Sequence, residues 1–122
     1  MIQSLILVAL GGAAGSVARF LTVTAAARVA PGWPWGTLAV NVAGSLAIGL
    51  LSVALAARMP LSPLLIAGFL GGFTTFSAFS LDALSLWQAG QAPQAAAYVA
   101  ASVLLSLAAV ALGAALARSI AP

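Results

Sequence analysis

Neutral hydrogen-bonding side chains recur at four-residue intervals in two apolar stretches of the 122-residue chain. The first series is Thr37, Asn41 and Ser45, and the second is Tyr98, Ser102 and Ser106. Residues four apart lie on one face of a helix, so each series predicts a polar stripe. Amide and hydroxyl groups can donate to a polar ligand without carrying charge. The alternatives are a hydrogen bond between helices for Asn41 and, for the serines, bonding back to carbonyls four residues earlier.

A second candidate site is the segment 68–79, which holds four of the five phenylalanines in the chain. The pair Gly71-Gly72 followed by Thr74-Thr75 makes a poor helix centre, so we predict that a helix breaks here. Broken backbone at membrane depth must be buried in protein or line a site, where free carbonyl groups can bind a cation. The alternative is a continuous helix with a glycine packing notch.

The residue types that are missing exclude several kinds of chemistry. The chain has no Cys and no His, and its one acidic residue is Asp82, for which we expect a structural role. Thiol chemistry, an imidazole base and a carboxylate pair within one subunit are therefore excluded, and we predict that the chain is not an enzyme. Four arginines against one acid reflect a shortage of charge rather than a basic patch, so no nucleic-acid partner is expected.

The elements that must position these residues are membrane helices. Hydrophobic residues make up 64% of the chain and charged residues 4%, whereas soluble domains are about 45–50% apolar and about 25% charged. Four apolar stretches, at about 2–27, 35–57, 64–87 and 95–116, are each long enough to cross a bilayer. We therefore predict an all-α membrane protein in which residues 1–122 form a single four-helix transmembrane domain. The first stretch lacks a basic segment before it, so we expect a retained helix rather than a cleaved signal peptide.

Residues at the ends and along the faces of these stretches predict how the helices sit and pack. The aromatic residues Trp33, Trp35, Trp87 and Tyr98 lie near predicted span ends, where amphipathic rings are favoured. Small residues spaced by four allow close approach of helix backbones: Gly11 and Gly15, Ser45 and Gly49, Gly68 and Gly72.

The arginines bear on orientation in the membrane. Four spans put both termini on one side, with Arg58 and Arg118, while Arg28 and a snorkelling Arg19 lie on the other. Orientation is normally set by an excess of Lys and Arg in cytoplasmic loops, and this count is even. We therefore predict a dual-topology, antiparallel homodimer; the alternative is a single orientation set in another way.

Three segments together carry a family resemblance: GGAAGSVARF at 11–20, GTLAVNVAGS at 36–45 and GFLGGFTTFS at 68–77. In their order and spacing the chain resembles the Fluc (CrcB-type) fluoride channels over essentially its whole length. The resemblance implies a fluoride-selective channel of the bacterial inner membrane that lets fluoride leave the cytoplasm passively and so protects the cell. It also implies an antiparallel homodimer with two pores and a structural sodium ion at the dimer interface.

The resemblance also implies roles for individual residues. The fluoride pathway would comprise Asn41, Thr75, Phe76, Phe79, Tyr98, Ser102 and Ser106, with Arg19 near a vestibule. Backbone carbonyls of Gly71 and Thr74 from both subunits would hold the sodium. Val110 stands where some relatives extend the polar track with a hydroxyl.

General chemistry agrees with a fluoride pathway built from these residue types. Fluoride is small and strongly hydrated, so a pore must replace its water with donors such as amides, hydroxyls and the positive edges of Phe rings. A fixed cation inside the pore would bind the ion too tightly for rapid exit, and this chain has no Lys. One alternative, a small dual-topology proton-coupled multidrug exporter, needs a carboxylate in its first helix, and none is present there. A non-transporting helical packing subunit is the other alternative.

Overall fold

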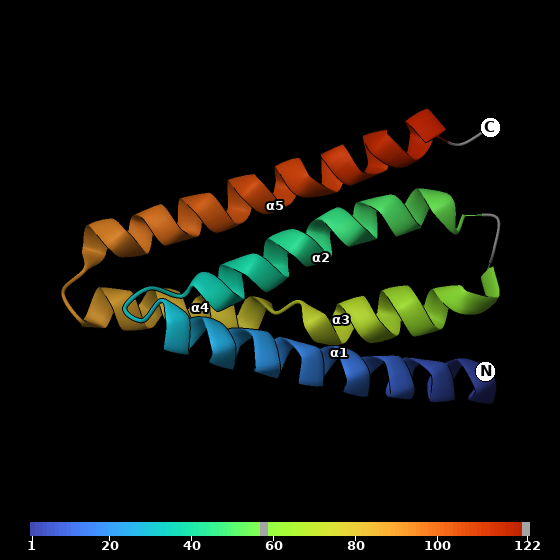
Figure 1. Cartoon of the computed structure of the whole chain (residues 1–122), viewed down its shortest axis with the longest axis horizontal. Helices are drawn as coiled ribbons and strands as arrows, with labels where there is room; N and C mark the ends of the chain where they lie inside the picture. The colour runs from blue at the N-terminus through green and yellow to red at the C-terminus, as the bar shows by residue number, and fades with distance from the viewer. Residues whose placement is uncertain (57–58, 121–122) are drawn as a thin grey trace.

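The computed structural model describes residues 1–56 and 59–120, which form four antiparallel helical spans (Figure 1). The first span is α1 (Ile2–Val29), the second is α2 (Trp35–Ala54), the third runs over Pro63–Gln88, and the fourth is α5 (Ala92–Ile120). Each has a mean hydropathy between 1.7 and 2.3 and is long enough to cross a membrane. The prediction of an all-helical chain with four membrane spans is confirmed. The second helix ends at Ala54 rather than near residue 57, which lies outside the described residues.

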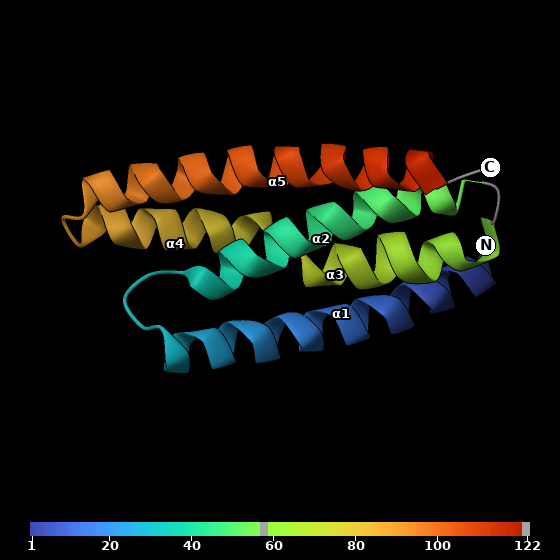
Figure 2. The ribbon, with the colours of Figure 1, turned by 45° about the horizontal axis from the view of Figure 1, so that its top comes forward.

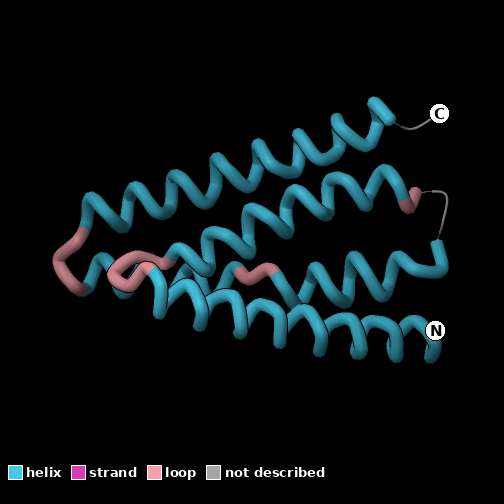
Figure 3. Tube along the Cα trace, in the orientation of Figure 1, coloured by secondary structure: helices cyan, strands magenta, loops and turns pink. Residues whose placement is uncertain are grey.

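The third span is made of several pieces. After the short turn η1 (Met59–Leu61), wide π-type turns form η2 (Pro63–Leu70), which continues as α3 (Gly71–Phe73). Thr74 and Thr75 then have extended backbone, with ψ of 157° and 120°, before α4 (Phe76–Gln88) begins. Figure 3 shows this interruption as a loop within the span. Of the four residues predicted to break the helix, Thr74 and Thr75 form the interruption, whereas Gly71 and Gly72 lie just before it. Gly71 has helical φ and ψ of −62° and −37°.

Helices pack in a fixed arrangement around the interruption. The first half of the third span lies against α1, whereas α4 and α2 both lie against α5 (Figure 2). The α1 contact is so close that a Cβ atom on Gly15 would overlap the carbonyl of Phe69. A Cβ atom on Gly49 of α2 would likewise overlap the carbonyl of Val110 of α5. The loops at 30–34 and 89–91 lie at the end of the molecule opposite the start of α1.

Most large apolar side chains point outward, as expected of a protein whose solvent is lipid. A cluster of buried apolar residues joins α2, α4 and α5 and comprises Leu38, Phe79, Leu86, Ala95 and Tyr98. Trp33, from the loop before α2, packs on this cluster. Tyr98, predicted to lie near a span end, is therefore fully buried in the core, while Trp87 at the end of α4 is exposed.

Candidate functional site

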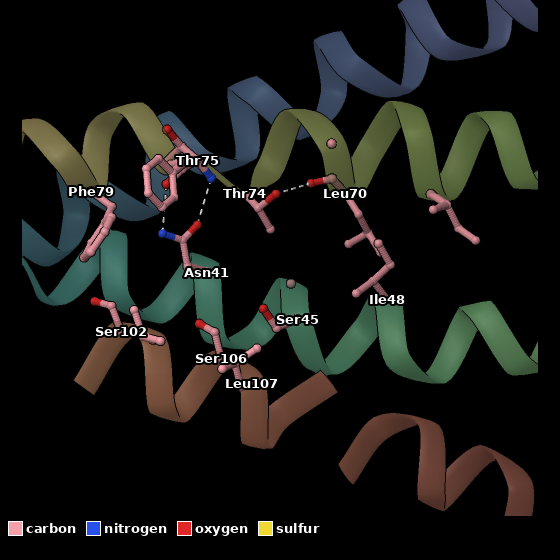
Figure 4. A pocket seen from close by; sticks show the side chains of 15 residues that line it. Asn41, Ser45, Ile48, Leu70, Thr74, Thr75, Phe79, Ser102, Ser106 and Leu107 are labelled. Atoms are coloured by element: carbon pink, nitrogen blue, oxygen red, sulfur yellow. Dashed lines mark hydrogen bonds between the residues drawn. The ribbon is translucent and has the colours of Figure 1, made fainter. Parts of the chain in front are cut away.

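An open groove of about 470 Å³ lies between α2, the interrupted third span and α5 (Figure 4). Eight residues with predicted roles line it: Asn41, Gly71, Thr74, Thr75, Phe76, Phe79, Ser102 and Ser106. Its other lining side chains are mostly aliphatic, among them Ile48, Leu70 and Leu107. The structure therefore brings together donors from three spans at the depth where the third span is interrupted.

Asn41 pairs with the whole peptide backbone of Thr75. The Thr75 N–H donates to Asn41 Oδ1 at 2.7 Å, and Asn41 Nδ2 donates to the Thr75 carbonyl at 2.9 Å (Figure 4). Because the amide oxygen must accept from the backbone N–H, the orientation of the Asn41 side chain is fixed. Its oxygen is occupied, and the second hydrogen of Nδ2 is left over. Since Asn41 also lines the groove, that hydrogen can serve a ligand.

Thr75 starts the second half of the span. Its Oγ1 accepts from the Ala78 N–H at 3.0 Å, which makes it the N-cap of α4. Ser77 Oγ lies 3.3 Å from the same oxygen. Thr75 is buried, and its hydroxyl holds the helix end in addition to facing the groove.

The four clustered phenylalanines separate into two pairs. Phe76 and Phe79 have ring centroids 5.3 Å apart in an edge-on arrangement, and both line the groove. Phe76 is 77% exposed, whereas Phe79 is 8% exposed and contacts Tyr98 with centroids 5.3 Å apart. Phe69 and Phe73 stack on each other, 5.8 Å between centroids, and are not groove-lining residues. Only the pair on α4 can present ring edges to an ion in the groove.

Ser102 carries a buried hydroxyl with no hydrogen-bond partner among the residues that the structure describes. The side chain is 5% exposed and lines the groove. Thr22, Thr74 and Ser80 each bond back to the carbonyl four residues earlier. No such bond is found at Ser102, so the back-bonding alternative does not hold there. A polar neighbour is the Tyr98 hydroxyl one turn earlier on α5, and the side chain also lines the groove, so the Ser102 hydroxyl is a candidate donor to a ligand.

Tyr98 lies outside the lining of the groove, on the same helix face as Ser102. Its hydroxyl donates to Asp82 Oδ2 at 3.2 Å, and its ring meets Trp33 edge-on at 5.3 Å. Asp82 also lines a second, smaller hollow of about 280 Å³ beside Trp33 and the loop before α2. Sequence reasoning expected a structural role for Asp82, such as capping a helix or pairing with an arginine, and missed Tyr98. As the only carboxylate side chain, Asp82 was the available charged acceptor for a buried phenol.

Arg19 also lies elsewhere than expected. It was predicted to snorkel toward the far interface, but its Nη1 is 3.5 Å from the carbonyl oxygen of Thr74. Arg19 precedes Val29, the end of α1, by ten residues, or about 15 Å along the axis. The interruption offers a carbonyl closer than the interface, so the guanidinium turns inward.

The backbone around the interruption leaves carbonyl groups without their usual helical donors. In a continuous helix the N–H groups of Thr75 and Ala78 would donate to the carbonyls of Gly71 and Thr74. Here they donate to Asn41 Oδ1 and Thr75 Oγ1 instead. Within the described residues no group of three or more His, Cys, Asp or Glu side chains could hold a metal ion. The carbonyl oxygens of Gly71 and Thr74 therefore lack their usual helical N–H partners, and the Thr74 oxygen lies 3.5 Å from Arg19 Nη1 instead.

The sequence profile of the family described as CrcB-like protein, Camphor Resistance (CrcB), matches residues 6–114. The chain is 56% identical over 126 residues to the fluoride-specific ion channel FluC of Rhizobium etli (strain CIAT 652), covering 99% of this chain and 100% of that protein. It is 58% identical over 121 residues to the protein of the same name from Chelativorans sp. (strain BNC1), covering 95% and 97%. A third relative of that name, from Paracoccus denitrificans (strain Pd 1222), is 56% identical over 108 residues, or 87% of each chain.

Proposed function

The chain belongs to the CrcB-like protein family, and on that premise we propose that it is a fluoride-selective ion channel. It is a multi-pass protein of the bacterial inner membrane and not an enzyme. Passive exit of fluoride through it would keep the ion from accumulating in the cytoplasm. The channel function is supported by the relatives' names together with the chemistry of the groove.

The observation that carries the proposal is the unpartnered Ser102 hydroxyl in a groove that has donors but no cationic side chain in its lining. A small, strongly hydrated anion requires hydrogen-bond donors in place of water. The spare N–H of Asn41, the hydroxyls of Ser102 and Ser106, and the ring edges of Phe76 and Phe79 supply positive partial charge there. Each contact is weak, which suits an ion that must leave again.

We assign Tyr98 and Thr75 supporting positions in this pathway. Tyr98 lies on the same face of α5 as Ser102 and Ser106, closer to the 30–34 loop. Its hydroxyl and Asp82 lie outside the lining of the groove. Thr75 places Phe76 at the first position of α4 through its capping bond. An ion moving along the groove would pass between the donors that line it, which are the Asn41 amide and the hydroxyls of Ser102 and Ser106.

We propose a second copy as the missing wall of the pathway. The groove is open along one side, and the ring of Phe76 at its edge is 77% exposed. An exposed aromatic ring in a functional groove is suited to contact with protein as well as lipid. An antiparallel copy placed against this side would enclose one pathway in each subunit, giving two pores.

The proposed structural sodium would be held by the carbonyls of Gly71 and Thr74 from both copies. Two carbonyls from one copy are fewer than the ligands that a cation of this kind needs, so equivalent carbonyls of a second copy would complete the shell. When bound, the ion would supply positive potential near the pores without standing in them. Gly71 and Thr74 would orient their carbonyls, and Asn41 would hold the extended backbone that frees them.

Halide efflux from liposomes that contain the purified protein tests the proposed function. We expect fluoride to leave and chloride to be retained. We also expect Ser102→Ala to reduce fluoride efflux about tenfold, because it removes one donor worth about 1–2 kcal/mol to an ion. Ser80→Ala on α4 is the matched control, since that hydroxyl already bonds to the Phe76 carbonyl and is exposed. Equal efflux of both halides, or of neither, would refute a fluoride channel.

Proton flux that depends on a drug would distinguish an exporter from a channel. A proton-coupled exporter must trade protons for drug at an accessible carboxylate. Asp82 is the only carboxylate side chain, and it is engaged by Tyr98 outside the groove. Drug-dependent proton flux from the same liposomes, abolished in Asp82→Asn, would favour the exporter instead.

A further inference from the structure

We propose that Arg19 is a built-in cation for the interrupted span: it occupies the Thr74 carbonyl when sodium is absent and competes with sodium for it. The inference rests on the proposed function, since that proposal places the sodium at Gly71 and Thr74. It adds a role for a side chain of α1 in setting how strongly sodium binds.

The packing of α1 brings Arg19 to this position. Gly15 and Gly72 have no room for a Cβ atom, because the carbonyls of Phe69 and Gly12 lie against them. The backbone of α1 thus runs directly along the first half of the third span. One turn beyond Gly15, Arg19 extends past the end of α3, and its Nη1 lies 3.5 Å from the Thr74 oxygen.

The Thr74 carbonyl needs a positive partner. It stands at the carboxyl end of a half-helix, where aligned peptide dipoles leave negative partial charge. Its normal donor would be the N–H of Ala78, but that N–H is bound to Thr75 Oγ1 at 3.0 Å. Arginine side chains commonly bind the last carbonyls of a helix, and Arg19 does so here.

The acidic side chain of this protein does not neutralise the charge of Arg19. Asp82 is the only acidic residue, and it accepts from Tyr98 on another face of the molecule. The guanidinium remains charged under all ordinary conditions. Two cations at one carbonyl repel each other, so we expect sodium binding to weaken the contact between the guanidinium and Thr74.

Removing the charge at residue 19 should therefore tighten sodium binding and weaken the sodium-free protein. The assay measures thermal unfolding of the purified protein in detergent as N-methylglucamine is replaced by sodium. In Arg19→Gln we expect the sodium concentration for half-maximal stabilisation to fall by about tenfold, as expected for loss of a unit charge a few ångströms away. Without sodium, this variant should unfold at a lower temperature than the unsubstituted protein.

Two further variants make the test specific. Arg28→Gln removes the same charge near the end of α1 and should leave the sodium midpoint unchanged. Arg19→Lys keeps the charge and should keep the midpoint within about twofold. An unchanged or higher midpoint in Arg19→Gln would overturn the competition.

A measurement on the unsubstituted protein does not depend on whether a variant folds. Among its four arginines, one guanidinium should shift in ¹⁵N NMR spectra as sodium is added, with the same midpoint as the thermal stabilisation. Arg19→Lys identifies that signal by its loss. The absence of any shift, or of any stabilisation by sodium, would refute the inference. Fluoride efflux from liposomes, measured separately, would still decide the proposed function.

Discussion

At the scale of single residues, Asn41 shows how one amide can serve structure and ligand together. Its oxygen and one N–H hold Thr75, and only the remaining N–H is available to the groove. An anion in the groove therefore meets a donor at this position and never the amide oxygen. In the proposed channel, a preference for an anion at Asn41 would thus come from a hydrogen bond to the backbone rather than from a charged side chain.

Asn41→Asp tests this double role. The substitution places a carboxylate oxygen against the Thr75 carbonyl and removes the donor from the groove. We expect a loss of about 1–3 kcal/mol in unfolding free energy, from one lost hydrogen bond and one newly unpaired acceptor, and near-complete loss of fluoride efflux. Ser52→Ala, on the same helix with only a local bond to Gly49, is the control and should retain efflux. Normal efflux in Asn41→Asp would show that the amide does not face the ion.

The aromatic pair of Phe76 and Phe79 gives a second test at this scale. If their ring edges solvate fluoride, replacing either by Ile should reduce efflux by at least about tenfold, because an aliphatic group has no positive edge. Only Phe79→Ile should also lower stability, since Phe79 is buried against Tyr98 while Phe76 is largely exposed. Phe76→Tyr, which keeps the ring, should retain more efflux than Phe76→Ile.

Efflux from liposomes and size-exclusion chromatography together separate these outcomes. Chromatography reports whether each Phe variant still folds and assembles. Unaltered efflux in both Ile variants would mean that the two rings only fill space and that the pathway lies elsewhere.

At the scale of elements, close contact between α1 and the third span holds Arg19 at the interruption. Gly15→Ala should separate the two elements, because its Cβ atom would collide with the Phe69 backbone carbonyl. We expect a loss of about 1–3 kcal/mol, as for other overpacking substitutions. Gly12→Ala is a close control on the same helix, since the nearest atom to its Cβ would lie 3.8 Å away. Thermal unfolding in detergent measures both, and equal stability of the two variants would contradict the packing argument.

The elements themselves were largely predictable from local sequence, whereas their contacts were not. Apolar length alone located four spans, and glycine spacing indicated where backbones meet. The extended backbone, however, falls at Thr74 and Thr75 because Asn41, 34 residues away from Thr75, supplies the bonds that replace the helix. Local propensity indicated the two glycines and the two threonines together, and only the threonines are extended. A pairing between distant residues leaves no trace in the local pattern.

The same reason explains which of the predicted residues line the groove and which do not. Helical periodicity put Ser102 and Ser106 on one face, and both line the groove. It could not indicate that the Tyr98 hydroxyl turns to Asp82, or that Arg19 turns inward to Thr74. Each side chain contacts an acceptor on another helical span, and which acceptor is near depends on which helices are neighbours.

At the scale of the whole molecule, the inward turn of Arg19 alters the charge balance between the two ends. Among the described residues, Arg28 lies at one end and Arg118 at the other, and Arg58 lies outside them. The proposed dual topology thus depends on small numbers of loop charges. An extra pair of lysines after α5 should force nearly all copies into one orientation.

If the working unit is an antiparallel dimer, that lysine-tagged chain should show greatly reduced efflux. Co-expression with a copy biased the other way should restore it. Cysteine accessibility from each side of the membrane, with a single cysteine introduced in the 89–91 loop, reports the orientation. Full efflux from a population that is entirely in one orientation would rule out the antiparallel dimer.

The pairing of Asn41 with Thr75 also constrains how the protein is made. The two residues belong to different spans, so their hydrogen bonds exist only after the third span has met α2. Alone in lipid, an extended Thr74-Thr75 backbone would leave peptide groups unpaired at a cost of several kcal/mol each. Because α2 is synthesised first, the third span should enter the membrane as an unbroken helix or leave the translocon already in contact with α2. Asn41 would then allow the helix to open at Thr74-Thr75 only after the third span has packed against α2.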